Sequence, residues 1–458
     1  MIFSSITFLY YFLPITIVLY FLTPQRHRNV TLLLVSLFFY GWSEPEIVFY
    51  MVLTITVNYV LGLLIEQKPE QKRLWLAISI VFCLGSLGYF KYVDFFIESI
   101  NQVTGLSLKL LHVALPVGIS FYTFQVLSYV IDVYRGDVMP QKSWIRLAAY
   151  ISMFPQLIAG PIVRYHDVAQ QLESRIYSME RTAEGGRRFV YGLAKKVLLA
   201  NMLGELCADF RMVQDNSMTF CWLYAAAFTL QIYYDFSGYS DMAIGLGKIL
   251  GFDFMENFRY PLVSKSITEF WRRWHISLGS WFRDYVYIPL GGSRVKPFRA
   301  FCNILIVWML TGLWHGAAWN FVLWGLYFAL LLLIEKSFLL DYMKDKAVVA
   351  HIYTIFAVVI SFVLFNGESL SQIAGDFAGM FGLAGLPLMT GETLYYLSGY
   401  GLILIAALIG ATPAVSMAAQ KLKGRAGWAE PLLLLCLLIL ITAYLVDGSF
   451  NPFLYFRF

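Results

Sequence analysis

The stretch of sequence that decides the fold is residues 301–334, which read FCNILIVWMLTGLWHGAAWNFVLWGLYFALLLLI. No formally charged residue lies between Arg299 and Glu335. An apolar run of about 20 residues is long enough to cross a bilayer as a helix. The stretch therefore predicts a chain that enters a membrane and holds one ionisable side chain, His315, at bilayer depth.

The rest of the chain has the same character. Of its 458 residues 59% are hydrophobic, 17% are aromatic and 14% are charged, whereas soluble domains carry roughly 25% charged residues. A soluble fold of this size could bury a large core, but it would not gather its apolar residues into runs of membrane-spanning length. We therefore exclude a soluble protein. Further spans are predicted at Ile2–Leu22, Ile47–Ile65, Leu74–Phe90, Ala347–Phe365, Leu402–Ala418 and Pro431–Val446.

The charges in the loops predict an orientation. Residues 1–22 lack the basic start and the small-residue cleavage site of a secretory signal, so we expect a retained first span. Basic residues in short loops stay on the cytoplasmic side. Arg26 and Arg28 follow the first span, an acidic loop at Glu44 follows the second, and basic residues return after Ile65. This alternation predicts that the N-terminus and residues 447–458 lie outside and that the first basic loop lies inside.

Two central stretches do not match simple spans. Residues 164–196 and 253–299 carry too many charges for lipid, yet both contain aromatic residues, so we expect amphipathic segments along the cytoplasmic interface. The apolar residues 147–163 contain Pro155 and Gly160-Pro161, which interrupt a helix. Non-helical backbone at membrane depth needs shelter from protein or from a water-filled cavity. We therefore expect a re-entrant element at residues 147–163.

His315 is the first candidate for a catalytic residue, because an ionisable group within an apolar span is costly and is a functional candidate by default. On one continuous helix Trp308, Thr311, His315 and Trp319 would share a face that lines a cavity. Burial favours the neutral, basic form of imidazole. Such a histidine could take the proton from a hydroxyl while its oxygen attacks an acyl thioester. The alternative is a structural histidine that bonds a carbonyl of a neighbouring helix.

His275 is the second candidate, within Trp271-Arg272-Arg273-Trp274-His275-Ile276-Ser277-Leu278; alternatively, it is an interfacial anchor. The remaining histidines are expected to be interfacial or solvated. They are His27, His112, His166 and His351. No metal site is expected, because the histidines are sparse and none pair at ligand spacing. A covalent serine or cysteine route is weakly supported, because the chain has no Gly-x-Ser-x-Gly elbow and no paired Cys/His signature.

A polar end to an apolar run gives a third candidate. Asp235 and Asp241 lie six residues apart with Tyr239 between them, after an apolar run that begins near Phe220. One interpretation is a lining element that orients a histidine or a substrate. The other is the end of a span followed by a solvated turn, and the residues alone leave both open.

Longer motifs point to a family. Residues 271–278, followed by Trp281-Phe282-Arg283-Asp284-Tyr285-Val286-Tyr287-Ile288-Pro289-Leu290-Gly291-Gly292-Ser293, resemble the membrane-bound O-acyltransferase (MBOAT) superfamily, and most closely its bacterial alginate O-acetyltransferase-like branch. Residues 116–125, 154–162, 234–241, 313–316 and 450–458 are also similar to that branch. The resemblance therefore covers essentially the whole chain.

The resemblance implies an all-α integral membrane protein with a single domain at residues 1–458. It implies a funnel of about ten to twelve spans with re-entrant and interfacial helices, in the bacterial cytoplasmic (inner) membrane. It also implies that His315 is the catalytic base and that His275 supports catalysis or the donor path. The substrate-binding residues that we expect are Trp271, Arg272, Arg283, Asp235, Tyr239, Asp241, Trp314 and Asn320.

The resemblance further implies transfer of acetyl groups from cytoplasmic acetyl-CoA across the membrane to an extracytoplasmic polysaccharide, commonly with a partner of the SGNH-hydrolase type. Basic residues such as Arg272, Arg273 and Arg283 would attract the anionic coenzyme. We expect no bound cofactor, no metal and no nucleic acid. Two alternatives remain: D-alanyl transfer to teichoic acid from a carrier protein, and a non-catalytic scaffold for polysaccharide export.

Overall fold

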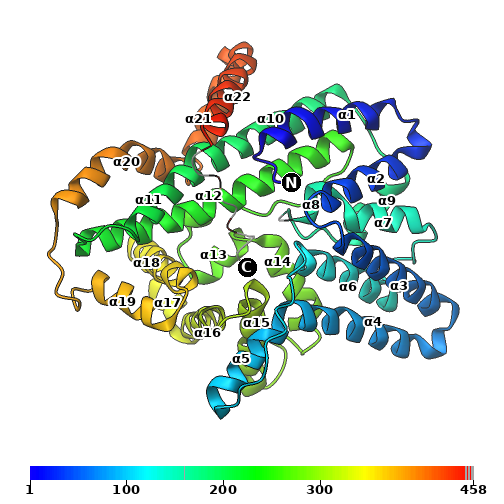
Figure 1. The fold of residues 1–458 in the computed structure, drawn as a ribbon, viewed down its shortest axis with the longest axis horizontal. Coiled ribbons are helices and arrows are strands. Elements are labelled where there is room, and N and C mark those ends of the chain that lie inside the picture. The colour runs from blue at the N-terminus through cyan, green and yellow to red at the C-terminus, as the bar shows by residue number, and fades with distance from the viewer. Residues whose placement is uncertain (159, 449–450, 452–453, 455–458) are drawn as a thin grey trace. The chain divides into compact units, whose positions relative to one another are not determined.

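The described chain is built from helices (Figure 1). The computed structural model describes residues 1–458 except 159, 449–450, 452–453 and 455–458, and it leaves out the side chains of residues 422–426. Within these described residues no strand occurs, so the predicted all-α class is confirmed. Most of the terminal motif at residues 450–458 lies outside the described residues.

Seven helical stretches of the described chain are long and apolar enough to cross a membrane. This number confirms a multi-pass membrane protein, while the expected total of about ten to twelve spans stays a prediction. A shorter apolar helix covers Phe8–Leu22. The seven stretches are Ile47–Gln67, Pro69–Thr104, Pro297–His315, Trp319–Met343, Ala347–Asn366, Gly391–Gly410 and Gly427–Asp447.

The predicted span Leu402–Ala418 was wrong in its bounds. Helix α20 covers Gly391–Gly410, and a separate helix, α21, begins beyond Pro413 at Ala414–Ala426. Proline lacks a backbone N–H and disfavours helical geometry in the residue before it, so a helix that approaches it from the N-terminal side stops. The apolar run continues through this break. Hydropathy alone therefore placed the predicted span too far toward the C-terminus, across the boundary between α20 and α21.

The chain divides into two compact units, each with its own internal packing. The first comprises Met1–Phe189 and Ser240–Met255, and the second comprises Val190–Tyr239 and Glu256–Phe458. Two helices contribute to both units, α10 at Met179–Ala194 and α12 at Met218–Leu250.

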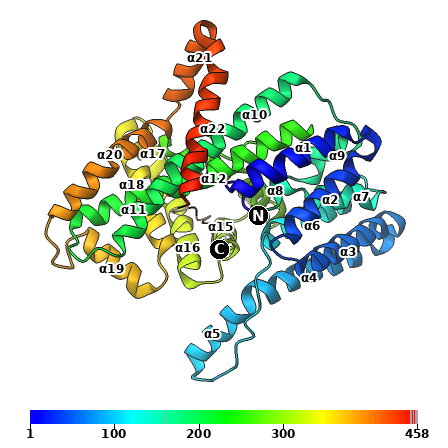
Figure 2. The same cartoon turned by 45° about the horizontal axis from the view of Figure 1, so that its top comes forward.

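In the first unit, the long helices α3 and α4 lie side by side (Figures 1 and 2) and α6 packs against both. Phe154 packs edge-on against Phe3 and Phe12. The elements of this unit follow in chain order, with η marking 3-10 and π-helices. They are η1 Phe8–Phe12, α1 Leu13–Leu22, η2 Gln25–His27, α2 Arg28–Gly41, α3 Ile47–Gln67, η3 Pro69–Gln71, α4 Lys72–Leu87, η4 Gly88–Tyr92, α5 Val93–Thr104, α6 Ile119–Arg135, α7 Trp144–Ser152, α8 Phe154–Leu157 and α9 Tyr165–Glu173.

The expected break in residues 147–163 is present. Helix α7 ends at Ser152, the short α8 follows with Pro155 in its first turn, and the described residues 160–164 before Tyr165 are not helical. Ile162 and Val163 in this non-helical part are fully buried within the unit. The protein therefore shelters the irregular backbone, as the sequence requires, while its entry into a membrane stays a prediction.

The second unit has a core rich in aromatic side chains. Phe270, Trp274 and Phe362 pack in sequence, with ring centroids 5.4 Å and 5.3 Å apart. The elements of this unit besides α10 and α12 follow in chain order. They are η5 Lys195–Asn201, α11 Met202–Phe210, η6 Pro261–Val263, α13 Ile267–Arg273, α14 Ile276–Phe282, η7 Arg283–Tyr287, α15 Pro297–His315, α16 Trp319–Ile334, η8 Glu335–Leu339, α17 Leu340–Met343, α18 Ala347–Asn366, α19 Leu370–Met380, α20, α21, η9 Gly427–Ala429 and α22 Glu430–Asp447.

The apolar stretch 301–334 forms a hairpin of two helices and not one continuous helix. α15 ends at His315, because Gly316 has extended backbone, and α16 starts at Trp319. The expectation that Trp319 shares the helical face of His315 was therefore wrong, and the Trp319 side chain is 51% exposed. His315 is therefore the last residue of α15, and its ring is buried.

Candidate active site

The second unit contains a cavity of about 490 Å³ whose wall is mostly apolar. Trp271, Trp308 and Thr311 line one part of it, and the cations Arg272, Arg283 and Lys336 also line it. Trp271, Arg272 and Arg283 were predicted as substrate-binding residues, and the structure brings all three to this one cavity. Apolar walls with a few polar groups are typical of small-molecule sites.

Helix α13, which carries Trp271 and Arg272 into the cavity, is held at its first turn by a buried carboxylate. Glu335, 1% exposed, accepts hydrogen bonds from the backbone N–H groups of Ile267 and Thr268 and from the Thr268 hydroxyl at 2.7 Å. The Ser266 side chain caps the same turn. A negative charge at a helix N-terminus is favourable, because it pairs with free backbone N–H groups. The wall of the cavity is therefore a fixed element.

His315 lies one helical turn beyond Thr311 in a box of aromatic rings. Its ring centroid is 5.0 Å from those of Trp314 and Trp324 and 5.4 Å from that of Phe365. The side chain is 6% exposed. Trp324 also packs against Trp271 of the cavity wall, with ring centroids 5.7 Å apart. A chain of aromatic contacts therefore connects the cavity with the buried imidazole.

His275 joins the same cluster from the turn between α13 and α14. Its ring centroid is 6.4 Å from that of His315, 5.8 Å from that of Trp314 and 4.6 Å from that of Phe236. His275 is fully buried, which does not fit an interfacial anchor. Burial lowers the pKa of His275 well below its usual value, and the neighbouring His315 acts in the same direction. The structure thus brings together the two histidines that were predicted to be catalytic.

Two further predicted residues support this cluster. Trp314 is buried and its ring contacts both histidine rings. The Asn320 amide donates a 3.0 Å hydrogen bond to the carbonyl of Phe365, whose ring contacts His315. Asn320 therefore fixes the aromatic box through the Phe365 backbone, as a support for the site.

The predicted residues on α12 have other partners. Asp235, 2% exposed, forms an ion pair with the buried Lys196 at 2.6 Å and accepts a hydrogen bond from the Leu454 backbone N–H. Tyr239 is 1% exposed. Asp241 belongs to the first unit, where it pairs with Arg188 at 2.8 Å. Their expected role in substrate binding stays a prediction.

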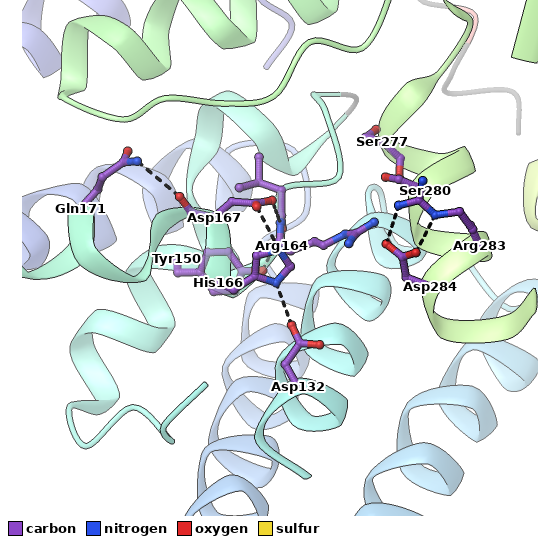
Figure 3. Close-up of polar contacts among 11 residues, drawn as sticks. Asp132, Tyr150, Arg164, His166, Asp167, Gln171, Ser277, Ser280, Arg283 and Asp284 are labelled. Atoms are coloured by element: carbon purple, nitrogen blue, oxygen red, sulfur yellow. Dashed lines mark hydrogen bonds and ion pairs between the residues drawn. The ribbon is translucent and has the colours of Figure 1, made fainter. Parts of the chain in front are cut away.

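His166 is exposed, as expected for a solvated or interfacial residue, and it lies between two carboxylates (Figure 3). Its Nδ1 is 3.1 Å from Asp132 and its Nε2 is 3.0 Å from Asp167. The hydrogen bond with Asp132, followed by that with Asp167, raises the pKa of His166 to about 9. Figure 3 also shows the Arg283 guanidinium held by both carboxylate oxygens of Asp284.

Three residues of the site were not predicted from the sequence. Trp324 lies within α16, Glu335 directly follows that helix, and Asn257 accepts a hydrogen bond from the ring of His275 at 3.2 Å. In the sequence Trp324 looks like a lipid-facing residue and Glu335 like a loop residue. Asn257 lies 18 residues before His275 without any motif around it. Only spatial contact identifies these three.

Comparison with known proteins gives consistent results. The profile of the membrane-bound O-acyltransferase family matches residues 140–371, about half of the chain. A probable alginate O-acetylase of Pseudomonas putida is 39% identical over 487 residues, with all of both chains covered. A peptidoglycan O-acetyltransferase of Helicobacter pylori is 32% identical, covering 85% of this chain and 81% of its own. A teichoic acid D-alanyltransferase of Bacillus subtilis is 31% identical over 54% of this chain and 65% of its own.

Family, fold and site thus agree. The matched region includes the cavity, both buried histidines and the α15–α16 hairpin. The relatives with full-length coverage are O-acetylases. The chain belongs to the membrane-bound O-acyltransferase family, in its alginate O-acetylase-like branch, and is an O-acyltransferase.

Proposed function

We propose that this protein is a membrane O-acetyltransferase of the bacterial cytoplasmic membrane, which moves acetyl groups from cytoplasmic acetyl-CoA for O-acetylation of an extracytoplasmic polysaccharide. The observation that carries the proposal is the pair of buried imidazoles, His275 and His315, linked by aromatic contacts to a cavity that cations line. The O-acetylase relatives support acetyl as the transferred group.

The cavity suits a donor with an anionic head and a less polar arm. Arg272, Arg283 and Lys336 supply positive charge for phosphate groups. Trp271 and Trp308, whose ring centroids are 4.6 Å apart, supply an apolar surface for the arm that carries the thioester. Acetyl-CoA has both features, and we propose it as the donor. Nothing in this assignment requires a bound cofactor.

We propose His315 as the base and His275 as its support. His315 takes the proton from the acceptor hydroxyl while the C–O bond forms and the C–S bond of the thioester breaks. The proton then passes to the leaving sulfur. Burial of both rings excludes bulk water, which limits hydrolysis of the thioester.

The acceptor is proposed from the relatives, which are named for the O-acetylation of alginate and of peptidoglycan. Both are polymers with sugar hydroxyls outside the cytoplasm. We propose that a partner of the SGNH-hydrolase type completes the transfer. D-alanyl transfer to teichoic acid is a second candidate, because the D-alanyltransferase of Bacillus subtilis matches about half of the chain. An export scaffold is set aside, because the chain is an acyltransferase.

The test is acetyl release from radiolabelled acetyl-CoA by purified protein in liposomes, with polysaccharide and candidate partner supplied. We expect turnover by wild type and its loss in folded His315→Ala. His27→Ala, at an exposed position in η2, is the matched control and should retain wild-type activity. Equal activity of the His315→Ala and wild-type proteins would overturn the role of His315. Turnover with a D-alanyl carrier protein, and none with acetyl-CoA, would favour the second candidate.

A further inference from the structure

One oxygen atom of Asn257 collects three hydrogen bonds around the buried histidine. Its Oδ1 accepts from the Ser277 backbone N–H at 3.2 Å and from the Ser277 hydroxyl at 2.9 Å. The Nδ1 atom of His275 lies 3.2 Å from the same oxygen. His275 and Asn257 are both 0% exposed, so these contacts are sheltered from water. The three contacts define the chemical form of the His275 ring.

The backbone contact identifies which atom of the Asn257 amide is the oxygen. A backbone N–H can only donate, so the atom that it meets must be an acceptor. The orientation of an asparagine amide is assigned from such a network. A carbonyl oxygen has no proton to donate, so Nδ1 of His275, 3.2 Å away, carries the proton. The Ser277 hydroxyl lies 3.5 Å from Nδ1 but donates its proton to Asn257 at 2.9 Å. In a neutral imidazole the other nitrogen, Nε2, then holds a lone pair.

Asn257 also stabilises an unusual backbone at this position. His275 has φ +44°, in the left-handed region that residues other than glycine rarely adopt. The carbonyl of Asn257 accepts a 3.0 Å hydrogen bond from the next backbone N–H, that of Ile276. Backbone held in sparsely populated regions often occurs at functional sites, where the surrounding structure over-determines it. Asn257 therefore holds both the ring and the backbone of His275.

The lone pair on Nε2 of His275 points to no hydrogen-bond donor among the described residues. Within the described part of the chain, Nε2 of His275 is buried and has no hydrogen-bond partner. Its contacting rings Phe236 and Trp314 are uncharged, and His315 is the titratable group that acts on it. Burial holds the pKa of His275 low, so the ring stays neutral.

The two imidazole rings are farther apart than a direct hydrogen bond between them would place them. A ring nitrogen lies about 1.1 Å from the centroid, so a direct hydrogen bond of about 2.9 Å would place the centroids about 5 Å apart. A shared oxygen, about 2.8 Å from each nitrogen, would place them roughly 6 to 7 Å apart. The observed separation is 6.4 Å. The geometry fits one bridging oxygen.

We propose that Asn257 is a positioning residue, which holds His275 as the Nδ1-protonated tautomer so that its Nε2 lone pair stabilises the proton taken up by His315. This inference rests on the proposed function. When His315 removes the hydroxyl proton it becomes cationic, and a bridging oxygen accepts from its N–H and donates to Nε2 of His275. The proton leaves His315 for the departing sulfur, and both rings return to their neutral forms.

The tautomer can be measured without any turnover. Protein with 15N-labelled histidine is compared with His275→Gln by NMR to identify the ring signals of His275. We expect a protonated Nδ1 and a bare Nε2 in wild type, and a mixture of both tautomers in Asn257→Leu. A bare Nδ1 in wild type would overturn the inference. Because the measurement needs no substrate, it stands even where the proposed acetyl transfer fails.

Activity supplies the second test, with Asn257→Asp and the matched control Ser277→Ala. A carboxylate 3.2 Å from Nδ1 favours imidazolium, and an adjacent opposite charge shifts a pKa by about 1 to 3 units. The acidic limb of the pH–kcat profile should therefore move to higher pH by about one unit or more in Asn257→Asp. Ser277→Ala removes one neutral contact of Asn257 and adds no charge beside Nδ1, so the limb should stay at its wild-type pH. A merely structural Asn257 would lower activity in Asn257→Asp equally at every pH and would overturn the proposal.

Discussion

Charged side chains inside the second unit are paired at short distance. Lys196 and Asp235 are each 2% exposed and lie 2.6 Å apart, and the Lys196 ammonium also donates to Asn201 at 2.9 Å. Lys196 lies in the π-helix η5. A π-helix is a local widening of an α-helix and often occurs at functional positions. Removing one charge of such a pair leaves the other to bear the cost of burial.

Asp235→Ala should therefore lower the free energy of unfolding by about 3 to 5 kcal/mol. The double variant Lys196→Met/Asp235→Leu should be more stable than Asp235→Ala, because neither charge is then left alone. Denaturant unfolding of purified protein in detergent measures both. Asp341→Ala, at an exposed position, is the control. Equal loss in Asp235→Ala and Asp341→Ala would show that the pair does not stabilise the fold.

The ion pairs of His166 predict a pH-dependent stability. The folded protein holds the His166 proton more tightly than the unfolded chain, since the pKa is about 9 in the fold and about 6.5 in the unfolded chain. The stabilising contribution is full below pH of about 6.5 and is lost as pH rises through about 9. The Tm difference between wild type and His166→Gln should therefore shrink over this window. A constant difference between wild type and His166→Gln over this window would contradict the linkage.

At the scale of elements, the α15–α16 hairpin is packed backbone to backbone through glycine. A Cβ added at Gly325 would lie 2.2 Å from the Trp308 carbonyl oxygen, and one at Gly312 would lie 2.2 Å from that of Phe321. Small residues at helix interfaces allow close approach in membrane proteins. This close approach sets the distance between His315 on one helix and Trp324 on the other.

Gly325→Ala should separate the two helices and cost about 2 kcal/mol or more, with loss of acetyl transfer. Gly399→Ala on α20 is the matched control, because nothing lies within 4 Å of the added Cβ. Alanine is also the better helix former, so the control should be neutral or slightly stabilising. Unfolding in detergent and acetyl release distinguish the two variants. Wild-type behaviour of Gly325→Ala would refute the role of this contact.

At the scale of the whole molecule, the loop charges predict which side of the membrane each segment faces. In a variant without the five native cysteines, Gln25→Cys should be labelled only from the cytoplasm and Glu44→Cys only from outside. Gln25 is exposed and Glu44 is partly exposed, so a reagent can reach both positions. Labelling then depends on the side of the membrane to which the reagent is added. A membrane-impermeant thiol reagent applied to intact cells and to inverted vesicles measures it. Labelling of both from one side would contradict the predicted orientation.

The class of the protein follows from its amino-acid sequence alone. Long apolar runs and sparse charge predict membrane helices, because each run must satisfy its backbone hydrogen bonds within itself. The motifs from 271 to 293 and at 313–316 predicted the family, and the cost of a histidine in an apolar span singled out His315. These inferences use local composition and spacing, which a sequence contains directly.

Only the tertiary structure decided how the site is assembled. α15 ends before Gly316, which packs tightly against the Phe321 ring, so Trp319 could not be placed correctly from helical periodicity. The partners of His275, Glu335 and Asp235 come from distant parts of the chain, and no local pattern marks Asn257 as the acceptor for the His275 ring. Such pairings follow from helix packing, in which glycine contacts and aromatic rings fix distances that the order of residues does not encode.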